Sequence, residues 1–336
     1  GKGRKAMLDA IASGAAGLVV GTHAVIQHDV AFANLGLAVV DEQHRFGVAQ
    51  RLALRDKLQA QALEPHLLMM SATPIPRTLA MTYFADLAVS TIDELPPGRT
   101  PVVTKLFADG RRDEVIARIR DEVAQGKQVY WVCPLIEESE ALDLRNATET
   151  HAELCAALPS AMVGLLHGRM PGAEKAAVMS LFTGAQMQVL VATTVIEVGV
   201  DVPNASLMVI EHAERFGLSQ LHQLRGRVGR GAVASVCVLL YTAPLSPTAK
   251  ARLRAMAETN DGFEIARRDL EIRGPGEFMG ARQSGDALLR FADLTGDNAL
   301  LEHARRVAPQ LLAEHPAAAA TQVQRWLASR VDYLKA

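Results

Sequence analysis

Short apolar runs recur along the first seventy residues, and each is about as long as a buried strand. They lie at 17–21 (GLVVG), 35–40 (LGLAVV) and 66–70 (HLLMM), with turn or polar residues nearby. The runs are continuous and do not alternate with polar residues, which is typical of parallel strands covered on both faces. The pattern therefore predicts a parallel α/β sheet in this part of the chain.

A proline-rich stretch at 93–101 (DELPPGRTP) ends this series. Its three prolines and one glycine break any helix or central strand, and we interpret it as an interdomain linker. Further apolar runs follow at 128–133, 162–166, 188–192, 207–210 and 236–241. Helix-like stretches such as 111–125 separate them, so a second α/β domain is expected.

After Pro247 the strand pattern stops, and 248–336 is expected to be helical except for a glycine-rich bend at 273–280. The predicted domains are therefore 1–95, 96–247 and 248–336. A chain of 336 residues with 49% hydrophobic content is long enough for two or three domains with cores of their own.

Composition adds little about partners. The formal net charge is −2, so any contact with nucleic acid must come from local clusters. The aromatic content of 4% argues against a platform that stacks many bases. No apolar run approaches the roughly 20 residues of a membrane span, and no signal peptide is predicted.

The three cysteines, Cys133, Cys155 and Cys237, are far apart and fit no metal-ligand spacing. Each stands in an apolar stretch, so we predict three buried thiols. A reducing, cytosolic compartment is the default that follows.

Two adjacent acids, Asp41 and Glu42, follow the second apolar run in the segment LAVVDEQHRFG. Ligands of open α/β sheets bind at the carboxyl ends of strands. There one acid can hold Mg²⁺ through water, and the other can orient and deprotonate an attacking water. The alternative is a solvated turn, because Asp-Glu pairs are common.

Two further loops follow predicted strands. The first, SATPIPRT at 71–78, offers small hydroxyl residues that can hydrogen-bond the acids, or it is an ordinary strand-to-helix loop. The second, 192–205, carries Thr193 and Thr194, which can reach a DNA phosphate. It also carries Gly199 and Asp201, where the aspartate can accept a ribose hydroxyl or simply form a turn.

The segment QLRGRVGR carries Arg227 and Arg230 three residues apart, on one face if the segment is helical. Gly226 and Gly229 permit close backbone approach. Arginines presented to a γ-phosphate raise the transfer rate by about 10³–10⁵. The alternative is a solvated basic face or a contact to a phosphate backbone.

The order of these clusters resembles superfamily-2 helicases and translocases, in which two RecA-like domains with parallel sheets flank one ATP. The resemblance implies that Asp41 is the Mg²⁺ ligand and Glu42 the catalytic base. It implies coupling roles for Gln43, His44, Ser71, Ala72 and Thr73. It also implies that Gln223, Arg227 and Arg230 sense and stabilise the γ-phosphate, and that Gly199 and Asp201 bind the nucleotide.

Two short segments resemble motifs of this superfamily that touch the DNA backbone. They are Gly21-Thr22-His23 in the first predicted domain and His167-Gly168-Arg169 in the second. Thr193 and Thr194 are expected to bind DNA as well. The alternatives for the two short segments are a helix cap and a turn at a strand end.

The segment 262–285 resembles the translocation motif shared by the RecG family and the transcription-repair coupling factor. There, a helical hairpin and the following loop couple ATP closure to movement on duplex DNA. Five residues are implied to grip a phosphate backbone or latch the hairpin: Arg267, Arg268, Arg273, Arg282 and Gln283. The alternative is a surface helix pair with solvated arginines.

Three features favour the RecG family: the linker, the sequence RGPGE at 273–277 and the sequence FADL at 291–294. The coupling factor more often has Ala where Pro275 stands in RGPGE. The resemblance covers the chain to about residue 306. It implies a bacterial, cytoplasmic and nucleoid-associated motor that uses ATP and Mg²⁺ to remodel branched duplex DNA. A non-catalytic binding module and the coupling translocase remain alternatives, and an RNA helicase fits the 262–285 motif less well.

The Walker A loop of such motors, G-x-x-x-x-G-K-[ST], does not occur in these residues. Gly1-Lys2 and Gly126-Lys127 are the two Gly-Lys pairs, and neither precedes Ser or Thr. We therefore expect a first domain truncated at its N-terminus, a half-sheet with an exposed edge. We also expect a missing N-terminal part, with the wedge domain, as partner, and negligible ATPase activity from the chain alone.

Overall fold

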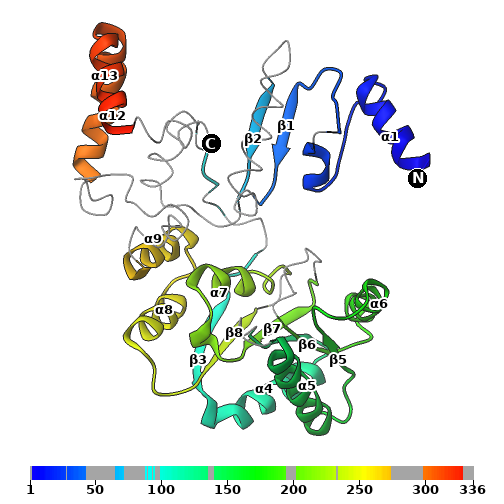
Figure 1. Ribbon diagram of the computed structural model, residues 1–336. Coiled ribbons are helices and arrows are strands. Elements are labelled where there is room, and N and C mark those ends of the chain that lie inside the picture. The colour runs from blue at the N-terminus through cyan, green and yellow to red at the C-terminus, as the bar shows by residue number, and fades with distance from the viewer. Residues whose placement is uncertain are drawn as a thin grey trace. The chain divides into compact units, whose positions relative to one another are not determined.

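The computed structural model describes residues 2–27, 29–42, 65–71, 88, 90–92, 94, 99–134, 140–193, 202–231, 234–273 and 298–327 (Figure 1). The chain forms two compact units. One unit comprises residues 1–73 with 297–336, and the other comprises residues 74–296. No described helix is both long and apolar enough to cross a membrane.

The first unit contains a two-stranded parallel sheet of β1 (Leu37–Val40) and β2 (His66–Met69). Both strands were predicted. Helix α1 (Lys2–Ala12) and the 3-10 helix η1 (His23–Ile26) precede the sheet in the chain. Val40 is buried against Ile26, Leu35, Ala38 and Leu67, which form a small core. Helices α12 (Asn298–Glu314) and α13 (Pro316–Leu327) contact each other.

The strand predicted at 17–21 is wrong. This segment is irregular, and the side chains of Leu18 and Val20 are 83% and 85% exposed. A strand needs a neighbour that pairs with its backbone groups. Within the described ranges nothing pairs with this segment, so its apolar residues alone do not make a strand.

The second unit is built on a six-stranded, fully parallel sheet in the order β3-β8-β7-β4-β6-β5. Five strands confirm the prediction: β4 (Gln128–Val132), β5 (Val163–Leu166), β6 (Val189–Ala192), β7 (Ala205–Ile210) and β8 (Val236–Tyr241). The edge strand β3 (Val103–Ala108) was not predicted, because Thr104 and Lys105 interrupt its apolar residues and none of its residues is fully buried.

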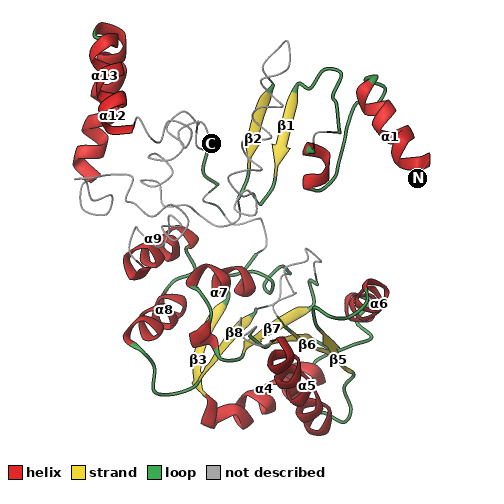
Figure 2. Ribbon diagram, in the orientation of Figure 1, coloured by secondary structure: helices red, strands yellow, loops and turns green. Residues whose placement is uncertain are grey.

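Helices cover both faces of this sheet (Figure 2). Successive residues of β4 point to opposite faces, so Val129 and Trp131 belong to one core and Tyr130 and Val132 to the other. The first core receives α4 (Arg112–Ala124) and α5 (Glu140–Ala157). The second receives α6 (Gly172–Thr183), α7 (Leu218–Arg225), α8 (Pro247–Glu258) and α9 (Gly262–Arg273).

The expected helical character after Pro247 is confirmed in the described residues. Ser246 begins α8 as its N-cap and accepts a hydrogen bond from the Ala249 amide at 3.1 Å, and Pro247 occupies the first turn. The bend expected at 273–280 lies beyond Arg273, outside the described residues.

The prediction of three buried cysteines is wrong at one position. Cys133 and Cys237 are buried, whereas Cys155 is exposed on α5. Leu154, the residue before it, is fully buried. Successive helical residues point about 100° apart, so the apolar neighbour faces the core while Cys155 faces solvent.

Candidate nucleotide and nucleic-acid site

The acidic pair lies directly after β1. Asp41 is exposed, and its Oδ1 accepts a hydrogen bond from the Glu42 amide at 2.8 Å. Glu42 is half-buried and has a left-handed backbone with φ of 53°. Such a conformation is uncommon for a residue other than glycine and is often found at functional sites. One exposed carboxylate at a strand end suits Mg²⁺, which keeps several waters and takes one or two carboxylates.

Ser71 lies at the same edge of the two-stranded sheet. Val40 pairs with Met69, and the Met70 amide donates to the Val40 carbonyl at 2.8 Å. The parallel strands therefore bring the acids and Ser71 to one edge, where ligands of open sheets bind. Gln43, His44, Ala72 and Thr73 lie outside the described residues.

The arginine segment begins on α7 and continues beyond it. Gln223 is half-buried on the helix, whose Leu218, Leu221 and Leu224 pack into the core. Because α7 ends at Arg225, Arg227 and Arg230 lie in the turn that follows and not on one helical face. The Arg230 Nε donates to the Gly226 carbonyl at 3.2 Å, which folds this turn back onto the helix end.

Sequence analysis missed the buried Arg225, which is 3% exposed. Its Nη1 donates to the carbonyls of Met256 at 2.9 Å and Thr259 at 2.8 Å, at the end of α8. Burial lowers the pKa of its guanidinium. The sequence could have predicted this burial, because Arg225 lies four residues after Leu221 and therefore on the apolar face of α7.

A second polar joint connects α7 with α9. Asp269 is 1% exposed, and its Oδ2 accepts a hydrogen bond from the Ser219 hydroxyl at 3.1 Å. Arg268 binds Glu264 at 2.8 Å and Glu258, the last residue of α8, at 2.6 Å. The arginine helix α7 is thus tied by charged and polar groups to α8 and α9, the two helices that form the hairpin.

The basic residues predicted on the hairpin are engaged with acids of the same helices. Arg267 binds Glu264 at 2.6 Å and also binds Glu271. Hydrogen bonds from Arg267 and Arg268 lower the pKa of Glu264 to about 2. Arg268 thus joins α9 to the end of α8, and its predicted role in gripping DNA or latching the hairpin stays a prediction. The side chain of Arg273, together with Arg282 and Gln283, lies outside the described residues.

His167 and Thr193 lie side by side at the carboxyl edge of the second sheet. They follow β5 and β6, where Leu166 pairs with Ala192, and the Thr193 amide donates to the Leu166 carbonyl at 3.1 Å. Thr193 is 2% exposed, and both its Oγ1 and the His167 Nδ1 are buried without a hydrogen-bond partner among the residues that the structure describes. Most buried polar atoms in proteins form a hydrogen bond, so these two atoms are candidates to bind a water, an ion or a ligand.

The turn after His167 is held by Lys175 of α6, whose Nζ donates to the Gly168 carbonyl at 2.6 Å. Arg169 is exposed in this turn. In the first unit Gly21, Thr22 and His23 are exposed, and Thr22 caps η1 with a hydrogen bond of 3.5 Å from the Ala24 amide. Thr194, Gly199 and Asp201 lie outside the described residues.

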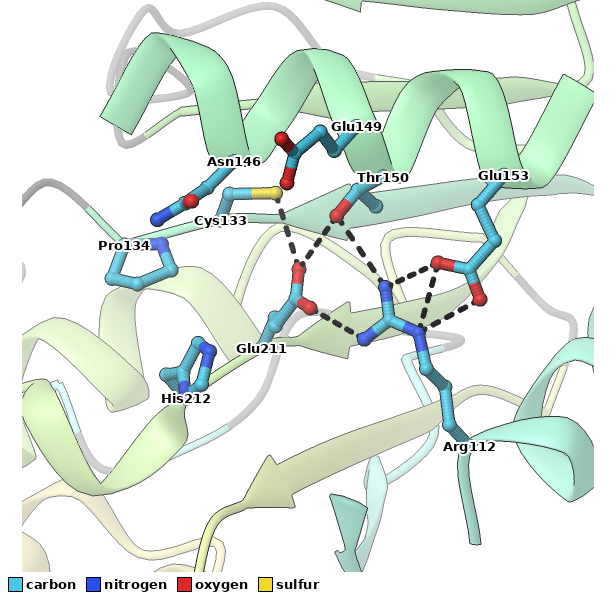
Figure 3. Close-up of a pocket in the computed structure, with 9 residues that line it drawn as sticks. All are labelled: Arg112, Cys133, Pro134, Asn146, Glu149, Thr150, Glu153, Glu211 and His212. Carbon is cyan, nitrogen blue, oxygen red and sulfur yellow. Dashed lines mark hydrogen bonds and ion pairs between the residues drawn. The ribbon is translucent and has the colours of Figure 1, made fainter. Parts of the chain in front are cut away.

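A polar pocket opens where β4 and β7 end, and sequence analysis did not find it (Figure 3). At its base the Glu211 carboxylate forms an ion pair with Arg112 and accepts hydrogen bonds from Trp131 Nε1 at 3.0 Å and Thr150 Oγ1 at 3.2 Å. Burial alone would raise the pKa of Glu211. The Arg112 charge and the hydrogen bonds outweigh that effect and lower it.

Glu211 also marks the point where the chain leaves β7 for α7. His212 follows with a left-handed backbone, φ 48° and ψ 48°. Arg252 of α8 then donates to the carbonyls of Glu214 at 3.1 Å and Phe216 at 2.6 Å. The connection that sets the start of the arginine helix is therefore held from both sides of the sheet.

Three family profiles match the chain. They are the DEAD/DEAH box helicase domain at residues 1–82, the helicase conserved C-terminal domain at 111–232, and the C-terminal part of domain 3 of ATP-dependent DNA helicase RecG at 259–333. Together they cover both α/β parts and the hairpin region.

Individual relatives agree with these profiles. ATP-dependent DNA helicase RecG of Acidithiobacillus ferridurans is 59% identical over 98% of this chain and 48% of its own length. RecG of Escherichia coli K12 is 57% identical over the whole of this chain and 49% of its own length. A solved structure of RecG bound to a three-way DNA junction matches 89% of this chain and 38% of its own, with a TM-score of 0.65 and 43% identity.

The chain spans about half the length of the curated relatives it matches. The aligned regions of these two relatives, each more than half identical overall, cover 98% and 100% of this chain. The parallel sheets with their helices agree with the two helicase domains that the profiles describe. The chain therefore belongs to the RecG family of superfamily-2 helicases.

Proposed function

We propose that this chain supplies the motor of an ATP-dependent translocase on double-stranded DNA that remodels branched DNA, such as stalled forks and Holliday junctions. The observation that carries the proposal is the joint between the arginine helix and the hairpin. Arg225 and Asp269, both buried, tie α7 to α8 and α9. A movement of α7 that follows ATP hydrolysis would therefore move the hairpin with it.

In this proposal Asp41 would hold Mg²⁺, and a bound ion would supply charge neutralisation at the phosphates. Glu42 orients the attacking water and takes its proton. Gln223, Arg227 and Arg230 approach the γ-phosphate from the second domain. Gln43, His44, Ser71, Ala72 and Thr73 couple the two domains, and Gly199 and Asp201 bind the nucleotide.

We place the DNA backbone along the carboxyl edge of the second sheet. The buried, unpartnered atoms of His167 and Thr193 support this assignment, because a phosphate oxygen there would satisfy the threonine hydroxyl. Arg169 adds positive charge at the same edge. Thr194, Gly21, Thr22 and His23 are proposed to extend the contact, and Arg273, Arg282 and Gln283 to act with the hairpin.

We further propose that these 336 residues alone hydrolyse ATP negligibly, because they contain no G-x-x-x-x-G-K-[ST] segment to hold the phosphates. The partner that supplies it is an N-terminal part of the same protein, which acts in the bacterial cytoplasm. The proposed domains are 1–95, 96–247 and 248–336.

The test is DNA-stimulated ATP hydrolysis on a forked duplex, measured for these residues alone and for the full-length protein. We expect activity only from the full-length protein, and Glu42→Gln should lower its kcat about 10²–10⁴-fold. The matched control is Glu114→Gln, an exposed acid paired with Arg111 on the surface. Activity from the 336 residues alone would overturn the proposed dependence on a missing phosphate-binding loop.

A further inference from the structure

The linker between the two α/β domains touches the arginine segment directly, and Arg99 makes the contact. Its Nε donates to the Gly229 carbonyl at 3.1 Å, and its Nη2 donates to the Gly226 carbonyl at 3.1 Å. These two carbonyls lie just before Arg227 and just before Arg230. The Arg99 guanidinium is thus hydrogen-bonded to the backbone directly before Arg227 and directly before Arg230.

We propose that Arg99 is a positioning residue that holds Arg227 and Arg230 in the orientation needed for hydrolysis and makes that orientation depend on the linker. The inference rests on the proposed function. Arg99 contacts neither nucleotide nor DNA in this proposal, and it acts only through the turn that carries the two arginines.

Close packing of the linker against the same turn supports the proposal. Gly229 has φ of +74°, and a Cβ added to it would lie 2.8 Å from Val102 Cγ2. Val102 is 7% exposed and belongs to the same core as Leu224 and Val228. The Val103 amide then donates to the Ser235 carbonyl at 3.0 Å, which joins the end of the linker to the residue before β8.

The chemistry of the guanidinium suits this task. Its rigid fork presents several N–H donors, so two carbonyls can be bound at once in a fixed geometry. A lysine at this position has a single nitrogen on a flexible stem and cannot reproduce both directions. Arg230 Nε also donates to the Gly226 carbonyl, so the side chains of Arg99 and Arg230 are both hydrogen-bonded to the same oxygen.

The electrostatic surroundings also connect Arg99 to the arginine helix. Burial is the main cause that lowers the pKa of His222 to about 4, and the charges of Arg225 and Arg99 add to it. His222 is therefore neutral at neutral pH. The positive charge near the helix end is carried by arginines whose directions are set by hydrogen bonds.

The experiment uses the full-length protein and compares Arg99→Gln and Arg99→Lys with Arg120→Gln. Arg120 is the matched control, because it is an exposed arginine that donates to the Ala157 carbonyl at 3.2 Å on the α4 and α5 side of the sheet. We expect both Arg99 variants to lower the DNA-stimulated kcat about 10–100-fold, as misplaced catalytic groups do. ATP KM and duplex affinity should change less than about twofold, and Arg120→Gln should match wild type.

A double-mutant cycle separates positioning from general stability. In an Arg227→Ala background, Arg99→Lys should have no further effect on kcat if it acts through the arginine turn. Independent effects that multiply, or an unchanged kcat in Arg99→Lys, would overturn the inference. If Arg99→Gln fails to fold, Arg99→Lys, which keeps the charge, carries the test.

The failure of the proposed function has a different signature. In that case the wild-type full-length protein shows no DNA-stimulated hydrolysis, and Arg227→Ala changes nothing. The inference about Arg99 alone would be wrong if the wild type is active, Arg227→Ala is inactive and Arg99→Lys is fully active.

Discussion

The two parallel sheets differ in how far their strands are covered. In the second unit the residues of β4, β6 and β7 are all buried. In the first unit Leu37, Val39 and Leu68 are 55%, 52% and 49% exposed on β1 and β2. The apolar runs look alike in sequence, so the difference comes from neighbouring strands and helices and not from the runs themselves.

The same contrast applies to the charged groups. In the second unit Arg225, Glu211 and Asp269 are held by partners from distant parts of the chain. In the first unit Asp41 is exposed, and its carboxylate accepts from the adjacent amide. The arginine half of the proposed site is thus held by hydrogen bonds within its own unit, whereas Asp41 of the acidic half is exposed.

Breaking the buried ion pair of the second unit should have the largest effect. Glu211→Gln leaves Arg112 with Glu153 but removes its buried partner, and we expect a loss of about 3 kcal/mol in the free energy of unfolding. Trp131 is fully buried and donates to Glu211, so its fluorescence reports this unit once Trp326→Phe removes the other tryptophan. Glu149→Gln, at the exposed rim of the same pocket, is the control.

The pH dependence of that loss has a definite sign. The pKa of Glu211 is lowered in the folded chain, so its contribution is present above the ordinary carboxyl pKa of 4.5. The contribution disappears as the pH falls from there through the lowered pKa. The stability gap between wild type and Glu211→Gln should therefore be constant near neutral pH and narrow in acid. A gap that widened in acid would contradict the assignment.

Removing the joint between α7 and the hairpin should have a smaller effect. Arg225→Met keeps the length and apolar stem of the side chain but leaves the Met256 and Thr259 carbonyls without their donor. We expect a loss of about 2 kcal/mol in the free energy of unfolding, from the buried polar groups left unsatisfied. In hydrogen exchange, the amides of α8 and α9 should lose protection more than those of α4. Equal loss in all three helices would argue against a local joint.

Thr193 offers the opposite case, a buried hydroxyl without a hydrogen-bond partner in the described part of the chain. Thr193→Val keeps the shape and removes the unpaired hydroxyl, so the free energy of unfolding should stay the same or rise by up to about 1 kcal/mol. Duplex affinity of the full-length protein should fall about tenfold, equal to about 1.4 kcal/mol. Thr193→Ser is the control that keeps the hydroxyl. Weaker folding with unchanged affinity would make Thr193 a structural residue.

Local patterns in the sequence predicted some features of the fold and the site, but not those that depend on distant partners. Seven of the predicted strands, and the position of Asp41 directly after one of them, followed from apolar runs and a local motif. The strand at 17–21 failed, and β3 was missed, because pairing depends on neighbours distant in sequence. Arg99 and Glu211 escaped notice for the same reason, since the partners that define them lie 127 and 99 residues away.

The smallest effect is expected in the first unit, at the surface ion pair between Arg4 of α1 and Asp29. Its atoms lie 2.5 Å apart, but the side chains are 66% and 47% exposed. Exposed pairs contribute roughly 0–1 kcal/mol, because water and salt screen them and two side chains must be ordered. Asp29→Asn should therefore change the protection of α1 amides in hydrogen exchange less than about threefold, and added salt should remove even that difference. A change of tenfold or more that salt does not alter would mean that this pair is shielded from water. Charged side chains of the first unit would then be shielded from water as they are in the second unit. The contrast between the two sheets would hold for their apolar residues but not for their charged residues.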